Sequence, residues 1–433
     1  MKEKFTNLLL GPIKTATFIQ SVQTFSATVV NGIFGALFYI FAARYLGPSE
    51  FGLLTVSIAL LTLLTDVGDL GTDTGLVNFV SKYRLEKSDL AMKYLKLSLK
   101  IKFCMWLLIL AIGIVIAKPL AFHAFKKPEL FPYLRIAFIG TWSMLSFSFI
   151  THTLQAYQKF LQWGLLQVVF NFLRLVMMFI IFYLFSISVT NTLWLYIFIP
   201  FAGFIVGLTL TPKFWLVKGE NSVLREFFHY NKWVAIFTAI SALAARMDTF
   251  LAASILTSFQ LGLYAAASQL VKIIPQFVTA LGTVIAPKMA TLKNNDELSL
   301  YLKKTFSLVG LIIVVGILTI PLIIYFVPIM FGSEYLGSIP IFLVLFIAML
   351  VFLFSVPLHM AVIYYFSYPK LFMYLSVFSL ANILLVGYFM LNAYGAIGAS
   401  YTVLINQVVG FFIPMIWIMK KINHKSISVL SNN

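Results

Sequence analysis

Residues 44–75 read RYLGPSEFGLLTVSIALLTLLTDVGDLGTDTG, and this stretch decides the fold class. After the Gly-Pro pair at 47–48, an apolar run follows that is long enough for a helix crossing a bilayer. Asp66, Asp69 and Asp73 come next at offsets of three and seven, which on one continuous helix places them within about 60° of each other. Because carboxylates are costly in hydrocarbon, we expect this acidic stripe to face protein or a water-filled cavity.

Three glycines in the same segment repeat these offsets on a neighbouring face: Gly68, Gly71 and Gly75. Glycine has no side chain, so a second helix can approach such a face closely. We therefore expect another helix to pack there.

The composition is that of a membrane protein. The chain has 433 residues, of which 61% are hydrophobic and 10% charged, whereas soluble domains carry about 25% charged residues. Apolar segments recur from end to end and predict an all-α polytopic membrane protein. The lysines before the first segment precede no cleavage site, so we expect no cleaved signal peptide. Cys104 is the only cysteine, which excludes internal disulfides and a cysteine-built metal site.

The sequence predicts twelve spans, at 16–43, 51–75, 101–117, 134–157, 162–187, 191–211, 233–255, 262–287, 305–327, 340–365, 371–391 and 396–419. Most lysines and arginines fall in alternate connections, the N-terminus and the C-terminal tail. The positive-inside rule therefore predicts that both termini lie in the cytoplasm. The net charge of +17 is then a topology signal, and we expect no nucleic-acid partner.

A short internal repeat supports an even division of the spans. The 17 residues from Tyr45 align without gaps with those from Ile255, and Gly52 then corresponds to Gly262. Two six-helix lobes related by a pseudo-two-fold axis along the membrane normal follow from this alignment. The expected domains are an N-terminal lobe (1–211), a cytoplasmic linker (212–232), a C-terminal lobe (233–419) and a cytoplasmic tail (420–433).

Several predicted spans carry polar residues on one helical face. These include Asn31 with Gln20 and Thr24, Asn171 with Arg174, Gln276 with Gln269 and Lys272, and His152 with Ser148. Such faces indicate an aqueous interior, because a helix exposed to lipid all round is apolar all round.

Two alternatives stay open for the charged residues. Arg174 and Arg246 are either ligands for a substrate or structural partners of Asp66 or Asp248. Asp69 and Asp73 either line the cavity or lie solvated at the headgroups. His152 and His359 are more often packing residues than proton carriers.

The motifs then point to a family. The stretch from Arg44 resembles the N-terminal signature of the polysaccharide biosynthesis (O-antigen-type, Wzx-like) flippases of the multidrug/oligosaccharidyl-lipid/polysaccharide (MOP) exporter superfamily. AARMDTFLAASILTSFQLGLYAAASQLV from Ala244, MFGSEYLGSIPIFLVL from Met330 and NAYGAIGASYTVLINQ from Asn392 are similar to later segments of that family. The resemblance implies two lobes around a central cavity in the cell membrane, and an oligosaccharide linked to a polyprenyl diphosphate as the substrate.

The residues agree with such a substrate. A diphosphate needs fixed cations, which Arg174, Lys272 and Arg246 can supply. Sugar hydroxyls need amide partners such as Asn31, Asn171 and Gln276. We expect Asp66, Asp69 or Asp248 to exchange H⁺ or Na⁺ and so to couple transport to an ion gradient. Membrane lipids and polysaccharide-assembly enzymes are the other expected partners.

Two other functions remain as alternatives. A cation-coupled drug exporter of the same superfamily would have a similar architecture, although cationic drugs require carboxylates rather than cations in the cavity. An integral-membrane glycan polymerase or glycosyltransferase would want a larger outer loop with carboxylates. No nucleotide-binding loop, zinc-protease motif or cysteine pair is present, so we expect neither an enzyme nor a cofactor.

Overall fold

The computed structural model describes residues 16–430, with the side chains at 16–19, 21, 221, 280, 283 and 423–430 excepted. This part of the chain is helical throughout and contains no strand. The fold therefore confirms the predicted all-α membrane protein. The placement of the N-terminus in the cytoplasm concerns residues outside the described range.

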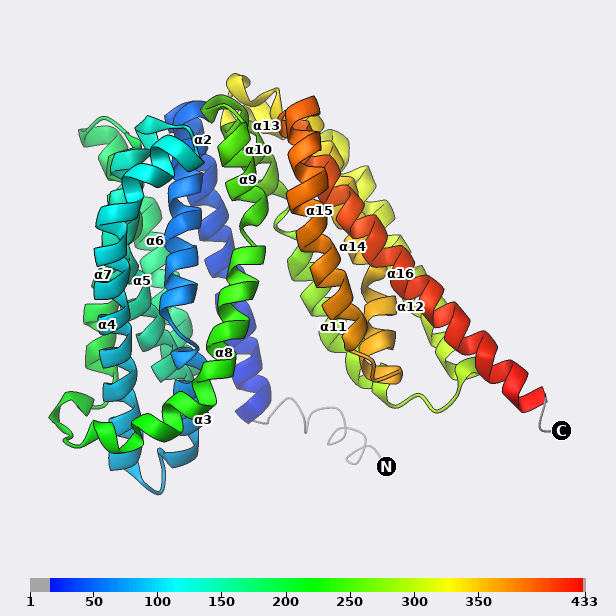
Figure 1. Cartoon of the computed structure of the whole chain (residues 1–433), viewed down its shortest axis with the longest axis horizontal. Coiled ribbons are helices and arrows are strands. Elements are labelled where there is room, and N and C mark those ends of the chain that lie inside the picture. Colours follow the sequence, from blue (N-terminus) through cyan, green and yellow to red (C-terminus); the bar gives the residue numbers. More distant parts are fainter. Residues whose placement is uncertain (1–15, 431–433) are drawn as a thin grey trace, which may run out of the picture. The chain divides into compact units, whose positions relative to one another are not determined.

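The chain forms two compact units, and each is described by itself. One unit comprises Met1–Leu46 and Leu53–Arg246, and the other comprises Gly47–Gly52 and Met247–Asn433. The first unit contains α2 (Ala16–Gly68), α3 (Thr72–Tyr83), α4 (Ser88–Pro119), α5 (Phe131–Ala156), α6 (Phe160–Leu184), α7 (Val189–Leu210) and α8 (Leu224–Ala244) (Figure 1). Within it α5 packs on α3, α4, α6 and α7.

Helix α2 combines the first two predicted spans. Its apolar part, Val22–Gly68, has 47 residues and would measure about 70 Å along a straight axis, more than twice the hydrocarbon thickness. The helix kinks at Gly47, where φ is 72° and ψ is 169°, and Pro48 follows. Glycine adopts a positive φ without steric cost, so this pair can turn the chain between two membrane-length arms.

The second arm ends earlier than predicted, and the prediction of one continuous helix over 51–75 was wrong. Helix α2 stops at Gly68, Leu70 and Gly71 both adopt positive φ (50° and 71°), and α3 starts at Thr72. Asp66 and Asp73 therefore lie on two different helices, with Asp69 in the turn between them. The apolar periodicity concealed this break because Gly71 was counted as a packing residue rather than as a turn residue.

The close approach predicted for the glycines is confirmed. A Cβ atom added at Gly68 would lie 2.8 Å from Ile109 of α4, and one at Gly71 would lie 2.9 Å from Val234 of α8. At Gly75 it would lie 2.2 Å from Asn231, also on α8. Helices α4, α5 and α8 are thus the close neighbours of these glycines, which the break at 69–71 takes off a single helical face.

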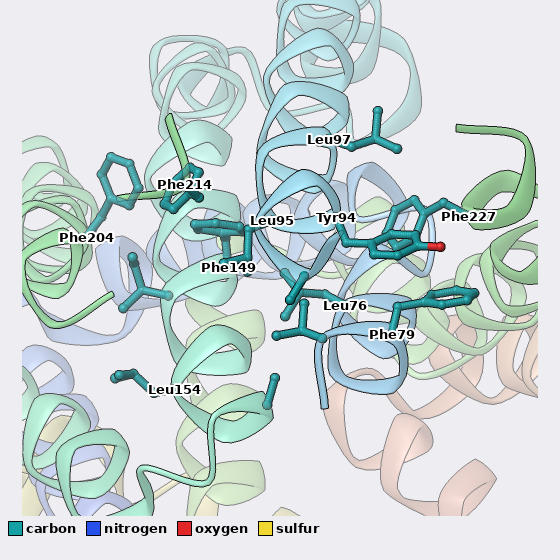
Figure 2. Close-up of a cluster of buried hydrophobic side chains, with 14 of the residues drawn as sticks. Leu76, Phe79, Tyr94, Leu95, Leu97, Phe149, Leu154, Phe204, Phe214 and Phe227 are labelled. Carbon is teal, nitrogen blue, oxygen red and sulfur yellow. The ribbon is translucent and has the colours of Figure 1, made fainter. Parts of the chain in front are cut away.

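An aromatic core joins α3, α4 and α8 within the first unit (Figure 2). The ring of Tyr94 on α4 stacks on that of Phe79 on α3 with centroids 4.6 Å apart, and it packs at 5.7 Å on Phe227 of α8. All three side chains are buried. Fully burying an aromatic side chain contributes about 1.5–3 kcal/mol, so this core fixes α3 against α4 and α8.

The second unit is built on α14. It contains α9 (Met247–Ile255), α10 (Ser258–Val271), α11 (Ile274–Ala290), α12 (Asn295–Leu318), α13 (Ile320–Phe331), α14 (Ser338–Met360), α15 (Lys370–Tyr394) and α16 (Ala396–Leu430). Helix α14 packs on α10, α11, α12 and α16, and α15 packs on α9 and α16 (Figure 1).

The residues that the internal repeat aligns meet inside the second unit. A Cβ atom added at Gly52 would lie 2.9 Å from the backbone nitrogen of Gly262 and 2.4 Å from the carbonyl oxygen of Ser258. No other residue fits at such a backbone contact. The pseudo-two-fold symmetry of the two halves stays a prediction.

Eleven helices of the described residues are long and apolar enough to cross a membrane. The kinked α2 counts once among them and covers two of the twelve predicted spans. The predicted span 305–327 is divided between α12 and the shorter α13. Helix α8 begins at Leu224, inside the range 212–232 that the sequence assigned to a linker. The lobe limits stay predictions.

Candidate functional site

A buried group of charges lies at the break between α2 and α3. The ammonium of Lys102, on α4, is fully buried and forms ion pairs with Asp69 and with Asp73, the latter at 3.1 Å between Nζ and Oδ1. Asp69 also accepts hydrogen bonds from the hydroxyl of Thr72 (2.7 Å) and from the backbone N–H of Asp73 (3.2 Å). Asp69 thus holds the first turn of α3, where a carboxylate interacts favourably with the helix dipole.

Helix α5 completes this group from a third direction. The hydroxyl of Ser148 donates to Asp73, and Nδ1 of His152 lies 3.3 Å from Asp73 Oδ1. Nδ1 of the same ring is also 2.9 Å from the carbonyl oxygen of Ser148. We call Asp69, Asp73, Lys102, Ser148 and His152 the charge cluster. Two carboxylates and one ammonium give it a charge of −1 when the imidazole is neutral.

Sequence reasoning found most of this cluster but missed Lys102. The sequence prediction placed Lys102 in the span 101–117, directly after the basic connection that contains Lys93, Lys96 and Lys100, and gave it no role. Those three lysines share one helical face, because they are spaced by three and four residues, whereas Lys102 lies about 200° from Lys100. That offset places Lys102 on the opposite side of α4, and it was the available signal.

Asp66 has a separate partner in the same unit. Its Oδ2 lies 2.7 Å from a guanidinium nitrogen of Arg246, whose Nε donates to the hydroxyl of Thr62 at 2.8 Å. Of the two carboxylates that the sequence offered as partners of Arg246, the structure pairs it with Asp66. Both side chains keep some exposure, 22% for Arg246 and 40% for Asp66, so the pair can still meet solvent.

Arg174 lies among aromatic rings. Its guanidinium carbon is 4.4 Å from the ring centroid of Tyr196 on α7 and 5.6 Å from that of Phe38 on α2. Its Nε is buried and has no hydrogen-bond partner among the described residues. One turn away on α6, the amide of Asn171 donates to the side-chain oxygen of Asn31, so the structure brings two of the predicted sugar-binding amides together. This part of the first unit offers a cation and amides on adjacent helices.

The predicted residues of the second unit have partners of their own. Asp248 Oδ2 accepts a hydrogen bond from the hydroxyl of Tyr264 (3.1 Å), and Oδ1 accepts one from the backbone N–H of Thr249 (2.7 Å). The ammonium of Lys272 donates to the side chain of Gln269 at 3.0 Å, and Lys272 is exposed. Gln276 is exposed as well. Among residues 16–430 no cluster of three or more His, Cys, Asp or Glu side chains could hold a metal ion.

A surface ion pair stabilises the loop before α8. Glu220 lies 3.3 Å from the ammonium of Lys96 and 3.8 Å from that of Lys100, and Lys96 also donates to the carbonyl oxygen of Val217. A hydrogen bond from its own backbone N–H, together with these two lysines, lowers the pKa of Glu220 below its usual value. These contacts hold the loop on the basic face of α4, which lies opposite the side that carries Lys102.

Comparisons with known proteins identify a family and several similar folds. The family model described as "Polysaccharide biosynthesis protein" matches residues 21–293. The fold is similar to that of the Lipid II flippase MurJ in its inward closed conformation, with a TM-score of 0.68 at 16% identity, over 93% of this chain and 87% of MurJ. An inward-facing multidrug resistance MATE family transporter of the MOP superfamily gives a TM-score of 0.71 at 12% identity, over 91% and 95%. A MOP superfamily transporter from Pyrococcus furiosus gives 0.60 at 11% identity, over 93% and 94%. No curated protein matches the sequence of this chain.

The many apolar helices support a multi-pass membrane protein, and its fold is similar to the folds of solved MOP superfamily transporters. The chain belongs to the polysaccharide biosynthesis protein family, as the match over most of its length shows, and this confirms the resemblance found in the sequence.

Proposed function

We propose that this protein is a flippase that moves a polyprenyl-diphosphate-linked oligosaccharide from the cytoplasmic to the outer leaflet of the cell membrane by alternating access. Membership of the polysaccharide biosynthesis family supports a glycan substrate. The similarity of the fold to a Lipid II flippase supports a lipid-linked one. The chain carries its substrate without converting it, and both termini lie in the cytoplasm, as the distribution of lysine and arginine indicates.

The observation that carries the proposal is the environment of Arg174. Its buried Nε has no hydrogen-bond partner among the described residues, and no carboxylate of that part of the chain forms an ion pair with it. A guanidinium within the membrane region without an anion is costly, and a phosphate oxygen supplies the missing acceptor. Asn31 and Asn171 lie on adjacent helices and suit the sugar hydroxyls next to that phosphate.

Lys272 and Gln276 of the second unit stay predicted ligands of the substrate. Both are exposed, and Lys272 sits beside Gln269, so a cation and two amides follow one another along α10 and α11. Arg246 is a weaker candidate, because its guanidinium already pairs with Asp66. The ion that drives the cycle, H⁺ or Na⁺, binds at Asp66, at Asp248 or at the charge cluster that contains Asp69.

The experiment is export of surface polysaccharide in cells that depend on this chain. Arg174→Ala and Lys272→Ala should reach the membrane at wild-type level but abolish export. Arg135→Ala removes an exposed arginine that lies over the ring of Phe131 and serves as the control, with export unchanged. Normal export by both test variants would overturn the proposed docking of the diphosphate.

The same cells distinguish the alternatives. A drug exporter would change resistance to amphipathic cations while leaving polysaccharide unaffected. A polymerase would leave short oligosaccharide on the outer leaflet when the chain is deleted, whereas a flippase leaves it on the inner leaflet.

A further inference from the structure

The charge cluster is a buried group with a net negative charge, which docking of a substrate does not require. It lies at the break between α2 and α3, it is almost entirely shielded from solvent, and it carries one more negative than positive charge. Lys102 is fully buried and Asp69 and Asp73 are each 9% exposed, yet the side chain of His152 keeps 35% of its surface open. One titratable group of the cluster can therefore exchange with water while the others cannot.

The hydrogen bonds of His152 fix which ring nitrogen is free. Nδ1 faces the carbonyl oxygen of Ser148 at 2.9 Å, and a carbonyl can only accept. Nδ1 also lies 3.2 Å from the hydroxyl of Ser148, whose hydrogen is donated to Asp73. We therefore assign the hydrogen of the neutral ring to Nδ1, which leaves Nε2 as the acceptor. An incoming proton binds at Nε2, and the charge that results is felt 3.3 Å away at Asp73 Oδ1.

No other charged group among the described residues near α5 supplies the positive charge that this proton would add. Helix α7 carries no charged residue, and the only one on α6 is Arg174, which stacks on Tyr196. Arg84 donates to the carbonyl oxygen of Ala156, one turn beyond His152, at 3.4 Å. From α3, α4 and the turn after α2, the groups that face the ring are Asp73, Lys102 and Asp69. Their sum is −1, and a buried group of charges is most stable when its net charge is zero.

We propose that the charge cluster is a proton-binding site in which His152 takes up one proton at Nε2 and thereby neutralises Asp73. With the proton bound, two cations and two carboxylates form a closed, neutral group that ties α5 to α3 and α4. Without it, the cluster holds an excess carboxylate next to a break in the membrane-spanning helix. Discontinuous helices are where transporters place coupling ions. The role of this proton in coupling rests on the proposed function, whereas its binding does not.

The test is nuclear magnetic resonance of the full chain in lipid nanodiscs with ¹⁵N-labelled histidine. The chain has five histidines, and His152→Gln identifies the signals of this ring. We expect the ring to gain a proton as the pH is lowered and its neutral form to carry hydrogen on Nδ1. A ring of constant charge at every pH at which the protein stays folded, or a neutral form with hydrogen on Nε2, would overturn the proposal.

Two variants separate a proton site from a merely structural histidine. Asp73→Asn removes the nearest negative charge and should lower the affinity of the ring for its proton at least about tenfold. Lys102→Met removes a positive charge and should raise it. If Lys102→Met does not fold, Asp69→Asn/Lys102→Met is compared with Asp69→Asn, which isolates the same charge. If the two variants changed the proton affinity of the ring in the same direction, or if neither changed it, the inference would be contradicted.

Flipping in vesicles is measured separately at several pH values, with His359→Gln as the control. His359 lies in the second unit and bonds to the carbonyl oxygen of Gly410 at 2.9 Å without a carboxylate partner in the described residues. If His152 binds its proton as predicted but the rate of flipping does not depend on pH, the proton site is confirmed and its role in coupling is refuted. Absence of flipping by the wild type would refute the proposed function, while the titration still decides the proton site.

Discussion

Replacing Lys102 by Met strands two carboxylates inside the first unit, and the size of the effect can be worked out from the structure. Met has nearly the same length and volume, so the change removes a charge and leaves the packing almost intact. The ammonium lies 3.1 Å from Asp73 Oδ1 and also pairs with Asp69. One such pair corresponds to about 5 kcal/mol at an effective dielectric constant of about 20.

The measured loss should be somewhat smaller. Removing one partner of a buried ion pair typically costs about 3–5 kcal/mol, and protonation of the stranded carboxylates limits the loss. We therefore expect Lys102→Met to lower the free energy of unfolding by about 3–5 kcal/mol at neutral pH. In the double variant Asp73→Asn/Lys102→Met one stranded charge is gone. Its loss should be smaller than the sum of the two single losses by at least about 1 kcal/mol.

The assay is reversible unfolding of the purified protein in mixed micelles with increasing dodecyl sulfate, followed by tryptophan fluorescence. Lys87→Met is the matched control, since Lys87 is exposed at the start of the same helix, and it should stay within about 0.5 kcal/mol of the wild type. Additive losses in the double variant, or a Lys102→Met protein as stable as the control, would refute the idea that the ammonium is held by both carboxylates.

Three further outcomes are expected. Gly75→Leu should lower the free energy of unfolding by about 1–3 kcal/mol in the same assay, because even a Cβ atom would lie 2.2 Å from Asn231; a variant of wild-type stability would contradict the close contact of α3 and α8. Arg174→Lys should not restore polysaccharide export to Arg174→Ala cells, because the planar guanidinium stacks 4.4 Å from Tyr196 and an ammonium cannot; full export would show that charge alone suffices. Glu220→Gln should speed hydrogen exchange in residues 217–223 at pH 7. The pKa of Glu220 is lowered in the folded protein, so its ion pair stabilises the loop above the ordinary carboxyl pKa and this stabilisation disappears as the pH falls through the pKa of the folded protein. The exchange rates of the variant and the wild type should therefore converge in acid. A difference in rate that persists in acid would exclude the ion pair as its cause.

The fold class and the kind of protein could be predicted from the sequence because they depend on local properties. Apolar segments of membrane length, the Gly-Pro pair at 47–48 and the family motifs all lie in contiguous stretches. The structure confirmed the helical membrane fold and the family. The close approach at Gly68, Gly71 and Gly75 was also predictable, because glycine has no side chain and admits a close neighbour, although the break at 69–71 means that the three do not share one helical face.

The charge cluster could be predicted only in part, because its members meet through tertiary packing. Asp73 and Ser148 are 75 residues apart, and their contact depends on how α3 packs on α5. Two polar faces were recognised separately, but nothing in the sequence showed that they face each other. Lys102 was given no role, although its helical angle separates it from the neighbouring lysines. The end of α2 at Gly68 was missed because hydrophobic periodicity continues past a turn residue such as Gly71.

The pairing of Arg246 with Asp66 illustrates the same limit. The sequence offered two carboxylates and two arginines without a rule to match them. The structure selects Asp66 for Arg246 and leaves Arg174 with aromatic rings instead of a carboxylate. That difference makes Arg174 the stronger candidate for a substrate anion.

The most direct test of the proposed function is movement of a fluorescent polyprenyl-diphosphate oligosaccharide across the bilayer of vesicles containing only this protein. Quenching by a membrane-impermeant reductant reports how much of the lipid has reached the outer leaflet. We predict rapid movement with the wild type, none above protein-free vesicles with Arg174→Ala, and recovery of the lipid chemically intact. Equal rates with and without the wild-type protein, or equal rates for the wild type and Arg174→Ala, would contradict the account.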